Sequence, residues 1–182
     1  MKYILEIAER LVTLLKELNA TVTTVESCTG GYIISTITDV EGASEITPGG
    51  YVTYSNQQKI NIGVPRDILE KYGVYSYECA KAMATQGRKN TGADFSIGVT
   101  GTFSNVDPNN NDSEIGIVYF SIVFNAEQAT AGKISVPIME RPQQKEYVTE
   151  IVLSKALDVA ESIYKALLEN DLINAVGKLP LT

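Results

Sequence analysis

Hydrophobic and polar positions follow two different periods along this chain, one typical of helices and one typical of strands. From 3 to 18, apolar side chains recur every three or four positions, which predicts an amphipathic helix. Short runs rich in β-branched and aromatic residues interrupt the helical pattern and predict strands. We expect five of them, at 21–25, 50–55, 94–100, 115–124 and 133–138.

The segments between these strands carry the start and stop signals of helices. Pro65 suits the first position of a helix, Ser76 can cap the next one, and Gly73 and Gly92 can end them. Helices are therefore expected at 30–38, 56–62, 65–73, 76–92 and 147–168, with a loose tail from about 174.

Alternating helices and strands predict an α/β protein, a three-layer α/β/α sandwich around a mixed sheet of roughly five strands. The last two strands are close enough in sequence to be antiparallel. A length of 182 residues favours a single domain, 1–182, with a substantial core.

Composition and net charge limit the classes of function that this chain can have. The net charge is −7 and the pI is about 4.7, which argues against a nucleic-acid or anionic-membrane surface but not against a small anionic ligand. We find no signal-peptide pattern and no long apolar run, and the two cysteines do not suggest a disulfide framework. A cytoplasmic protein is the expectation.

The most informative segment is Thr21–Gly31, where a β-branched strand runs into a turn of small residues that opens a helix. Such a turn places the Ser27 hydroxyl beside unpaired backbone N–H groups, which can hold a phosphate or an oxyanion. Ser27 or Thr29 could equally be a plain helix cap. The spacing of a P-loop is absent.

The chain contains no histidine, which excludes Ser-His-Asp and Cys-His catalysis. Lys59 follows the strand at 50–55 and is either a solvated surface charge or a desolvated base that activates a serine. Cys28 is a rival nucleophile, because a helix N-terminus can lower a thiol pKa, although a small packing role fits it better.

A polar loop at 105–113 lies between two strands, where α/β proteins place ligand-handling loops. Its carboxylates, Asp107 and Asp112, together with Glu114, are expected to be solvated. No clustered set of metal ligands appears, so we expect no metal.

Several further motifs stand in order along the chain. They are TVESCTGG (24–31), TDVEGAS (38–44), GGYVTYSN (49–56) with Lys59, IGVP (62–65), YGV (72–74) with Ser76, GAD (92–94) and VTG (99–101). Together they resemble the C-terminal domain of the CinA family, also known as nicotinamide-nucleotide amidases. The resemblance covers about residues 3 to 168, and the first and third motifs together are highly specific.

The resemblance implies an α/β/α sandwich that hydrolyses the carboxamide of nicotinamide mononucleotide, without metal or cofactor and usually as a homo-oligomer. It implies Ser27 as nucleophile, Lys59 as base, and Tyr54 as a group that orients or polarises the pair. The substrate-binding residues implied are Thr29, Gly30 and Gly31 as backbone donors, Asn56, Thr100, Gly101, and Arg141 as the phosphate-side cation, with Lys145 one helical turn on.

One segment departs from the family pattern. Residues 101–116 replace the glycine-rich family loop with an asparagine-rich one, although Gly101 and Gly116 remain. This leaves two alternatives open: a catalytically silent nucleotide- or partner-binding module, and an amidase for another small amide. The N-terminal domain of longer family members has no counterpart here, which fits a stand-alone form.

Overall fold

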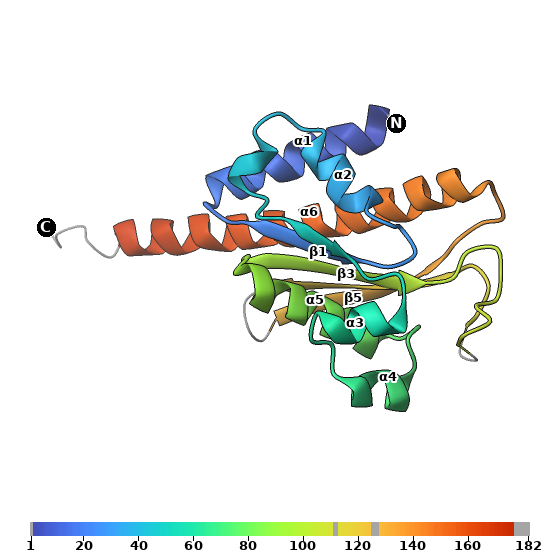
Figure 1. The fold of residues 1–182 in the computed structure, drawn as a ribbon. Coiled ribbons are helices and arrows are strands. Elements are labelled where there is room, and N and C mark those ends of the chain that lie inside the picture. The colour runs from blue at the N-terminus through green and yellow to red at the C-terminus, as the bar shows by residue number, and fades with distance from the viewer. Residues whose placement is uncertain (1, 111–112, 125–127, 177–182) are drawn as a thin grey trace, which may run out of the picture.

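Five strands form one mixed sheet in the order β2-β1-β3-β4-β5 in the computed structural model, which describes residues 2–110, 113–124 and 128–176 (Figure 1). β1 runs parallel to both β2 and β3, whereas β3, β4 and β5 are antiparallel neighbours. The carboxyl ends of β1, β2 and β3 therefore meet at one edge of the sheet. The strands are β1 (Val22–Glu26), β2 (Gly50–Val52), β3 (Phe95–Gly101), β4 (Ile117–Phe124) and β5 (Gln128–Ser135).

Helices cover both faces of this sheet, so the predicted three-layer α/β/α architecture is confirmed (Figure 1). One face carries α1 (Lys2–Glu17), α2 (Tyr32–Thr38) and the long α6 (Arg141–Val176), whose last turns extend past the sheet. The opposite face carries α3 (Asn56–Asn61), α4 (Arg66–Tyr72) and α5 (Tyr77–Thr91). A short 3₁₀ turn, η1 (Ala43–Glu45), leads towards β2.

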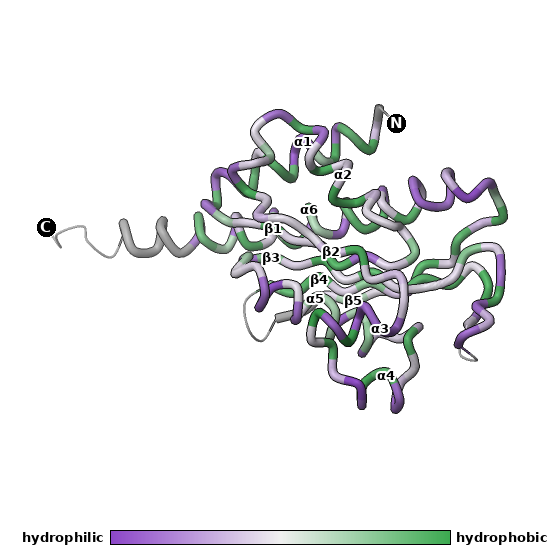
Figure 2. The backbone as a smooth tube through the Cα atoms, viewed as in Figure 1, coloured by the Kyte–Doolittle hydropathy of each residue, from purple (hydrophilic) through white to green (hydrophobic). Residues whose placement is uncertain are grey.

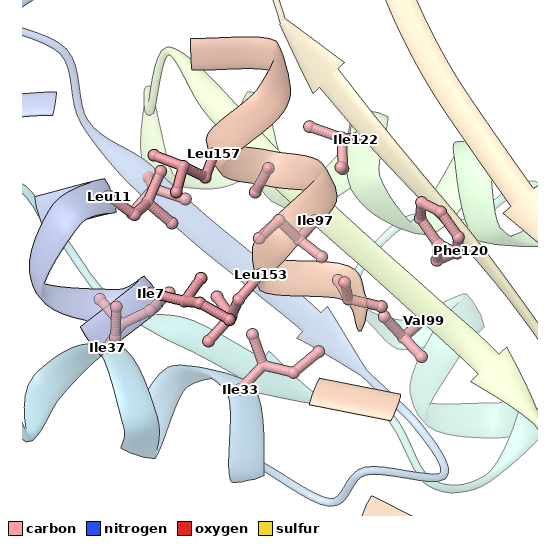
Figure 3. Packing of buried hydrophobic residues seen from close by; sticks show 14 of the residues in the cluster. Ile7, Leu11, Ile33, Ile37, Ile97, Val99, Phe120, Ile122, Leu153 and Leu157 are labelled. Atoms are coloured by element: carbon pink, nitrogen blue, oxygen red, sulfur yellow. The ribbon is translucent and has the colours of Figure 1, made fainter. Parts of the chain in front are cut away.

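The larger hydrophobic core lies between the sheet and the layer of α1, α2 and α6 (Figure 3). This core includes Ile97 of β3, Ile122 of β4 and Leu153 of α6, and all three side chains are buried. Full burial of each such side chain stabilises the fold by about 1.5–3 kcal/mol. Hydrophilic residues gather instead on outward turns, such as both ends of α4 (Figure 2).

On the other face, α5 lies unusually close to the sheet. A Cβ at Gly98 of β3 would collide with the carbonyl oxygen of Ala80, and a Cβ at Gly87 would collide with Val25. Glycine at both positions lets the helix backbone approach the strands directly. This close packing brings the turn before α5 to the edge where β1 and β3 end.

Most predicted elements are present, and their boundaries differ for physical reasons. β5 begins at Gln128 rather than 133, because an edge strand can include small polar residues that carry no alternating pattern. β2 ends at Val52 rather than 55. Pro65 precedes α4 as its cap instead of being its first residue.

The last helix departs most from its prediction. α6 begins at Arg141, not 147, because its first turns are polar and lack the apolar spacing that marks a buried face. It continues to Val176, past the predicted start of a loose tail at 174, and 177–182 lie outside the described residues. Within the described part of the chain, no helix has the length and apolarity needed to cross a membrane.

Candidate active site

A cavity of about 550 Å³ opens at the sheet edge where β1, β2 and β3 end. Ser27 directly follows β1, Tyr54 follows β2, and Gly101 closes β3; all three line the cavity. In open α/β sheets, ligands bind outside the carboxyl ends of the strands, where strand order reverses direction. β1, with β2 on one side and β3 on the other, is such a point.

Ser27 and Lys59 form a buried pair beneath this cavity. The Nζ of Lys59 donates hydrogen bonds to the Oγ of Ser27 at 3.2 Å and to the carbonyl oxygen of Thr53 at 2.9 Å. The exposed fractions of Ser27 and Lys59 are 5% and 2%. The interpretation of Lys59 as a solvated surface charge is therefore wrong.

Burial lowers the pKa of Lys59 below its ordinary value, because desolvation disfavours the ammonium form. Nearby negative charge opposes this shift, and Asp107 is one of its sources. A lysine with a lowered pKa supplies more of the neutral amine that can accept a proton from a hydroxyl.

Local sequence explains how Lys59 reaches Ser27. The Ser55 side chain caps α3 by accepting a hydrogen bond from the N–H of Gln58 at 3.2 Å. The capped helix begins at Asn56, so Lys59 lies on its inner face. The backbone of Ser27 is fixed by β3: its N–H donates to the carbonyl of Val99 at 3.0 Å and extends the β1–β3 ladder.

Glu26, the residue before Ser27, points to the opposite face and caps α2. Its buried carboxylate accepts hydrogen bonds from the N–H groups of Gly31, Ile33 and Ile34 at 2.9, 3.1 and 2.9 Å. Gly31 adopts a φ of 95°, a conformation that favours glycine. Neither Ser27 nor Thr29 is the cap of this helix.

Two of the backbone donors expected for a ligand are already engaged. The N–H of Gly31 binds Glu26, and the N–H of Gly30 donates to the Ser27 carbonyl at 3.1 Å. Neither glycine lines the cavity, and the space beside Gly30 holds the Nζ of Lys145. The expectation that Gly30 and Gly31 face the substrate is therefore corrected: they shape the turn.

The N–H groups of Cys28 and Thr29 remain as donors at this turn. Within the described chain neither bonds to an oxygen acceptor; Cys28 lines the cavity, whereas Thr29 is fully buried and does not line it. Burial is the largest influence on the Cys28 thiol and raises its pKa to about 12. A thiolate nucleophile is therefore disfavoured, contrary to the expected effect of the helix N-terminus.

Arg141, the first residue of α6, lines the cavity together with Tyr54. Its guanidinium donates to the Tyr54 hydroxyl at 2.8 Å and lies 5.4 Å from the ring centroid of Phe103. Tyr54 is 62% exposed, and in the described structure its hydroxyl bonds to neither Ser27 nor Lys59. The carbonyl of Thr53, rather than Tyr54, orients the lysine.

Two other predicted binding residues have different positions. Asn56 lines the cavity, and its side-chain amide donates to the Oδ1 of Asn110 at 2.6 Å. Thr100 is buried and does not line it, because its hydroxyl donates to the carbonyl of Val74 at 2.8 Å. Thr100 thus fixes the turn before α5 instead of contacting a ligand.

The polar loop between β3 and β4 forms a whole wall of the cavity, from Asn105 to Asn110. Asp107, expected to be solvated, is half-buried: it accepts hydrogen bonds from the hydroxyl of Tyr75 at 2.6 Å and the N–H of Asn109 at 2.9 Å. The side chain of Asn110 also donates to it. Sequence reasoning missed Asp107 and Tyr75, since only their spatial proximity reveals them.

The described residues contain no group of three or more cysteine or carboxylate side chains arranged to hold a metal ion. The cavity and the residues beneath it offer the Ser27 hydroxyl and the Lys59 amine, together with further hydroxyl and amide side chains, one guanidinium and one carboxylate.

Comparisons with known proteins agree with this architecture. Residues 4–164 match the model of the CinA C-terminal domain. A CinA-like protein from Flavobacterium psychrophilum is 37% identical over 160 residues, which are 86% of this chain and 35% of that protein. A putative competence-damage inducible protein from Thermoanaerobacter sp. is 42% identical over 67% of this chain and 30% of its own length. The chain thus spans about a third of these curated relatives.

Solved structures show the same fold. The competence/damage inducible protein CihA from Agrobacterium tumefaciens superposes with a TM-score of 0.78 at 27% identity, covering 86% of this chain and 96% of that one. A CinA superfamily protein from Escherichia coli also gives 0.78, at 25% identity, over 86% and 90% of the two chains.

Proposed function

Because the chain belongs to the CinA C-terminal domain family, we propose that it is an amidohydrolase acting on nicotinamide mononucleotide. The reaction consumes water and yields nicotinic acid mononucleotide and ammonia. The observation that carries the proposal is the buried hydrogen bond between Lys59 and Ser27 at the base of the cavity. A serine–lysine pair can perform acyl transfer without histidine.

The neutral amine of Lys59 accepts the proton of Ser27 as its oxygen attacks the carboxamide carbon. The resulting ammonium then gives that proton to the amide nitrogen, which leaves as ammonia when the C–N bond breaks. Water attacks the acyl-serine in a second, equivalent cycle and releases the carboxylate product. The lowered pKa of Lys59 favours its part as base, and the Thr53 carbonyl keeps its Nζ aimed at Ser27.

The tetrahedral intermediate needs donors for its oxyanion, and the N–H groups of Cys28 and Thr29 are available at the turn. A well-placed donor of this kind contributes about 3–4 kcal/mol to catalysis. The positive pyridinium ring of the substrate withdraws electrons from the carbonyl, so a modest base suffices. No metal or cofactor is required by this scheme.

Arg141 supplies the positive charge for the substrate phosphate at the cavity rim. Its guanidinium donates to the hydroxyl of Tyr54, which bonds to neither Ser27 nor Lys59 in the described structure. We further propose that the substrate is a free small-molecule nucleotide, with no nucleic acid or membrane involved, that the reaction occurs in the cytoplasm, and that the protein assembles as a homo-oligomer.

A second candidate is hydrolysis of another small amide by the same pair. The observation that favours it is the loop wall from Asn105 to Asn110, which lies in the segment that departs from the family pattern. Profiling a panel of carboxamides in parallel separates the two candidates.

The deciding experiment measures ammonia release from nicotinamide mononucleotide by the wild type and by Ser27→Ala. We expect turnover in the wild type and none in the variant. If neither releases ammonia although the wild type binds the nucleotide, the protein is the silent binding module instead.

A further inference from the structure

One wall of the cavity carries a fixed negative charge that no part of the proposed mechanism uses. Asp107 lines the cavity, and among the described lining residues it is the one acidic side chain and Arg141 the one basic side chain. The two are not paired with each other: Asp107 accepts hydrogen bonds from Tyr75, Asn109 and Asn110, while Arg141 donates to Tyr54. The cavity thus presents one charged side chain of each sign.

Hydrogen bonds hold the Asp107 carboxylate in place. Tyr75 and Asn110 both donate to its Oδ2, and the N–H and side-chain amide of Asn109 both donate to its Oδ1, at 2.9 and 3.2 Å. Asn110 in turn accepts from Asn56, the first residue of the helix that carries Lys59. The carboxylate is therefore positioned relative to the catalytic pair by a continuous chain of contacts.

Four donors saturate the lone pairs of this carboxylate, so it is poorly suited to accept a further hydrogen bond from a ligand. Its full charge still acts through space on a positive group. A pyridinium ring whose nitrogen carries ribose has a positive charge but no N–H to donate, so it is recognised by attraction without a hydrogen bond. When the carboxamide of such a ring lies at Ser27, the charged ring nitrogen is only three covalent bonds away from the carbon that Ser27 attacks.

We propose that Asp107 is a specificity-determining residue that selects carboxamides on a positively charged ring, while Arg141 selects the phosphate at the other end. The inference rests on the proposed function, because it names the substrate class of the same site. It explains why an acidic side chain lies in a cavity that also has to accept a phosphate: the preferred ligand carries both charges.

The test compares two ligands that differ only in ring charge: nicotinamide mononucleotide and benzamide riboside 5′-monophosphate, whose ring is neutral. Binding is measured by calorimetry in the Ser27→Ala background, which prevents turnover. We expect Asp107→Asn to weaken binding of the charged ligand by about three- to tenfold, as the loss of one through-space charge pair implies. Binding of the neutral ligand should be unchanged.

Two control variants separate charge from loop structure. Tyr75→Phe removes a hydrogen bond to the carboxylate but keeps its charge, and Asp67→Asn removes an exposed charge on α4. Both should leave the ratio of the two affinities unchanged. If Asp107→Asn weakens both ligands equally, or neither, the role of Asp107 is overturned while the amidase proposal stands. If wild-type protein neither binds nor deamidates nicotinamide mononucleotide, the proposed function fails, and the inference with it.

Discussion

The Nζ of Lys59 lies 3.2 Å from the Oγ of Ser27, although the two residues are 32 positions apart and almost fully buried. A buried lysine is costly for a fold unless its charge is paired, and this one contacts a hydroxyl and a carbonyl instead. Its lowered pKa is the consequence. A buried amine with a perturbed pKa at the base of a cavity is typical of an active site.

Removing the amine of Lys59 while keeping its apolar stem should abolish most activity. We expect Lys59→Met to reduce kcat/KM for ammonia release by about 10²–10⁴-fold, the range that general bases contribute. The matched control is Lys71→Met, at an exposed position of α4, which should retain wild-type rates. Full activity in Lys59→Met would remove the lysine from the mechanism.

The pH dependence of kcat/KM should follow the protonation of Lys59. Only the neutral amine can accept a proton, so the rate should rise with pH up to the lowered pKa of Lys59 and then level off. The negative charge of Asp107 raises that pKa, so Asp107→Asn should move the rising limb to lower pH. A rate profile of Asp107→Asn that coincides in position with the wild-type profile would contradict this coupling.

The same lysine makes stability depend on pH with a definite sign. Between the lowered pKa of Lys59 and its ordinary value of 10.5, the unfolded chain binds one more proton than the folded chain. The contribution of Lys59 to stability is therefore complete above 10.5 and is lost as pH falls through this window.

We expect the free energy of unfolding of the wild type, relative to Lys59→Met, to increase from pH 7 to about pH 9.5 in urea titrations. Lys71→Met, whose lysine is exposed, should show no such trend relative to wild type. A difference between wild type and Lys59→Met that stays constant with pH would mean that burial does not perturb this amine.

Sequence patterns were sufficient for the parts of the site that follow from the periods of strands and helices. The strand predicted at 21–25 leads into the turn at Ser27, and the helix predicted at 56–62 carries Lys59. The cap at Ser55 was not predicted, although a serine before a helical pattern is a typical signal for one. The α/β class follows from the same alternation of periods. These features depend on neighbours in sequence.

Other features depend on residues that are distant in sequence, and no local pattern contains them. In the sequence, Asp107 does not differ from other carboxylates in loops. Its partner Tyr75 comes from the turn before α5 and lies beside it only in the folded chain. The engagement of Gly31 by Glu26 was missed for a related reason, because the acceptor comes from the strand and not from a cap position. The early start of α6 at Arg141 was not predicted, because the first turns of this helix are polar and carry no apolar period.

Arg141 is expected to act on binding of the phosphate more than on chemistry. Arg141→Met should raise KM for nicotinamide mononucleotide by about tenfold or more, the effect of losing charge-assisted hydrogen bonds, with a smaller change in kcat. Nicotinamide riboside, which lacks the phosphate, provides the matched comparison, and its kinetics should change little. An equal loss with both substrates would place Arg141 in a structural role through Tyr54.

Glu26 should be essential for stability, although it faces away from the cavity. Its carboxylate satisfies three N–H groups at the start of α2 and also accepts from the Thr24 hydroxyl at 3.1 Å. Glu26→Gln puts an amide in its place, which has one acceptor oxygen and two N–H donors facing other donors. We expect a loss of about 2–4 kcal/mol in the free energy of unfolding, because buried donors lose a charged acceptor.

The control for this loss is Glu41→Gln, at an exposed position in the loop after α2, which should change stability by less than about 0.5 kcal/mol. Urea denaturation of both variants beside the wild type gives the comparison. Because the turn at Ser27 is anchored through the same carboxylate, folded Glu26→Gln protein should also lose kcat. If its stability and kcat both match those of Glu41→Gln, the carboxylate does not hold the turn.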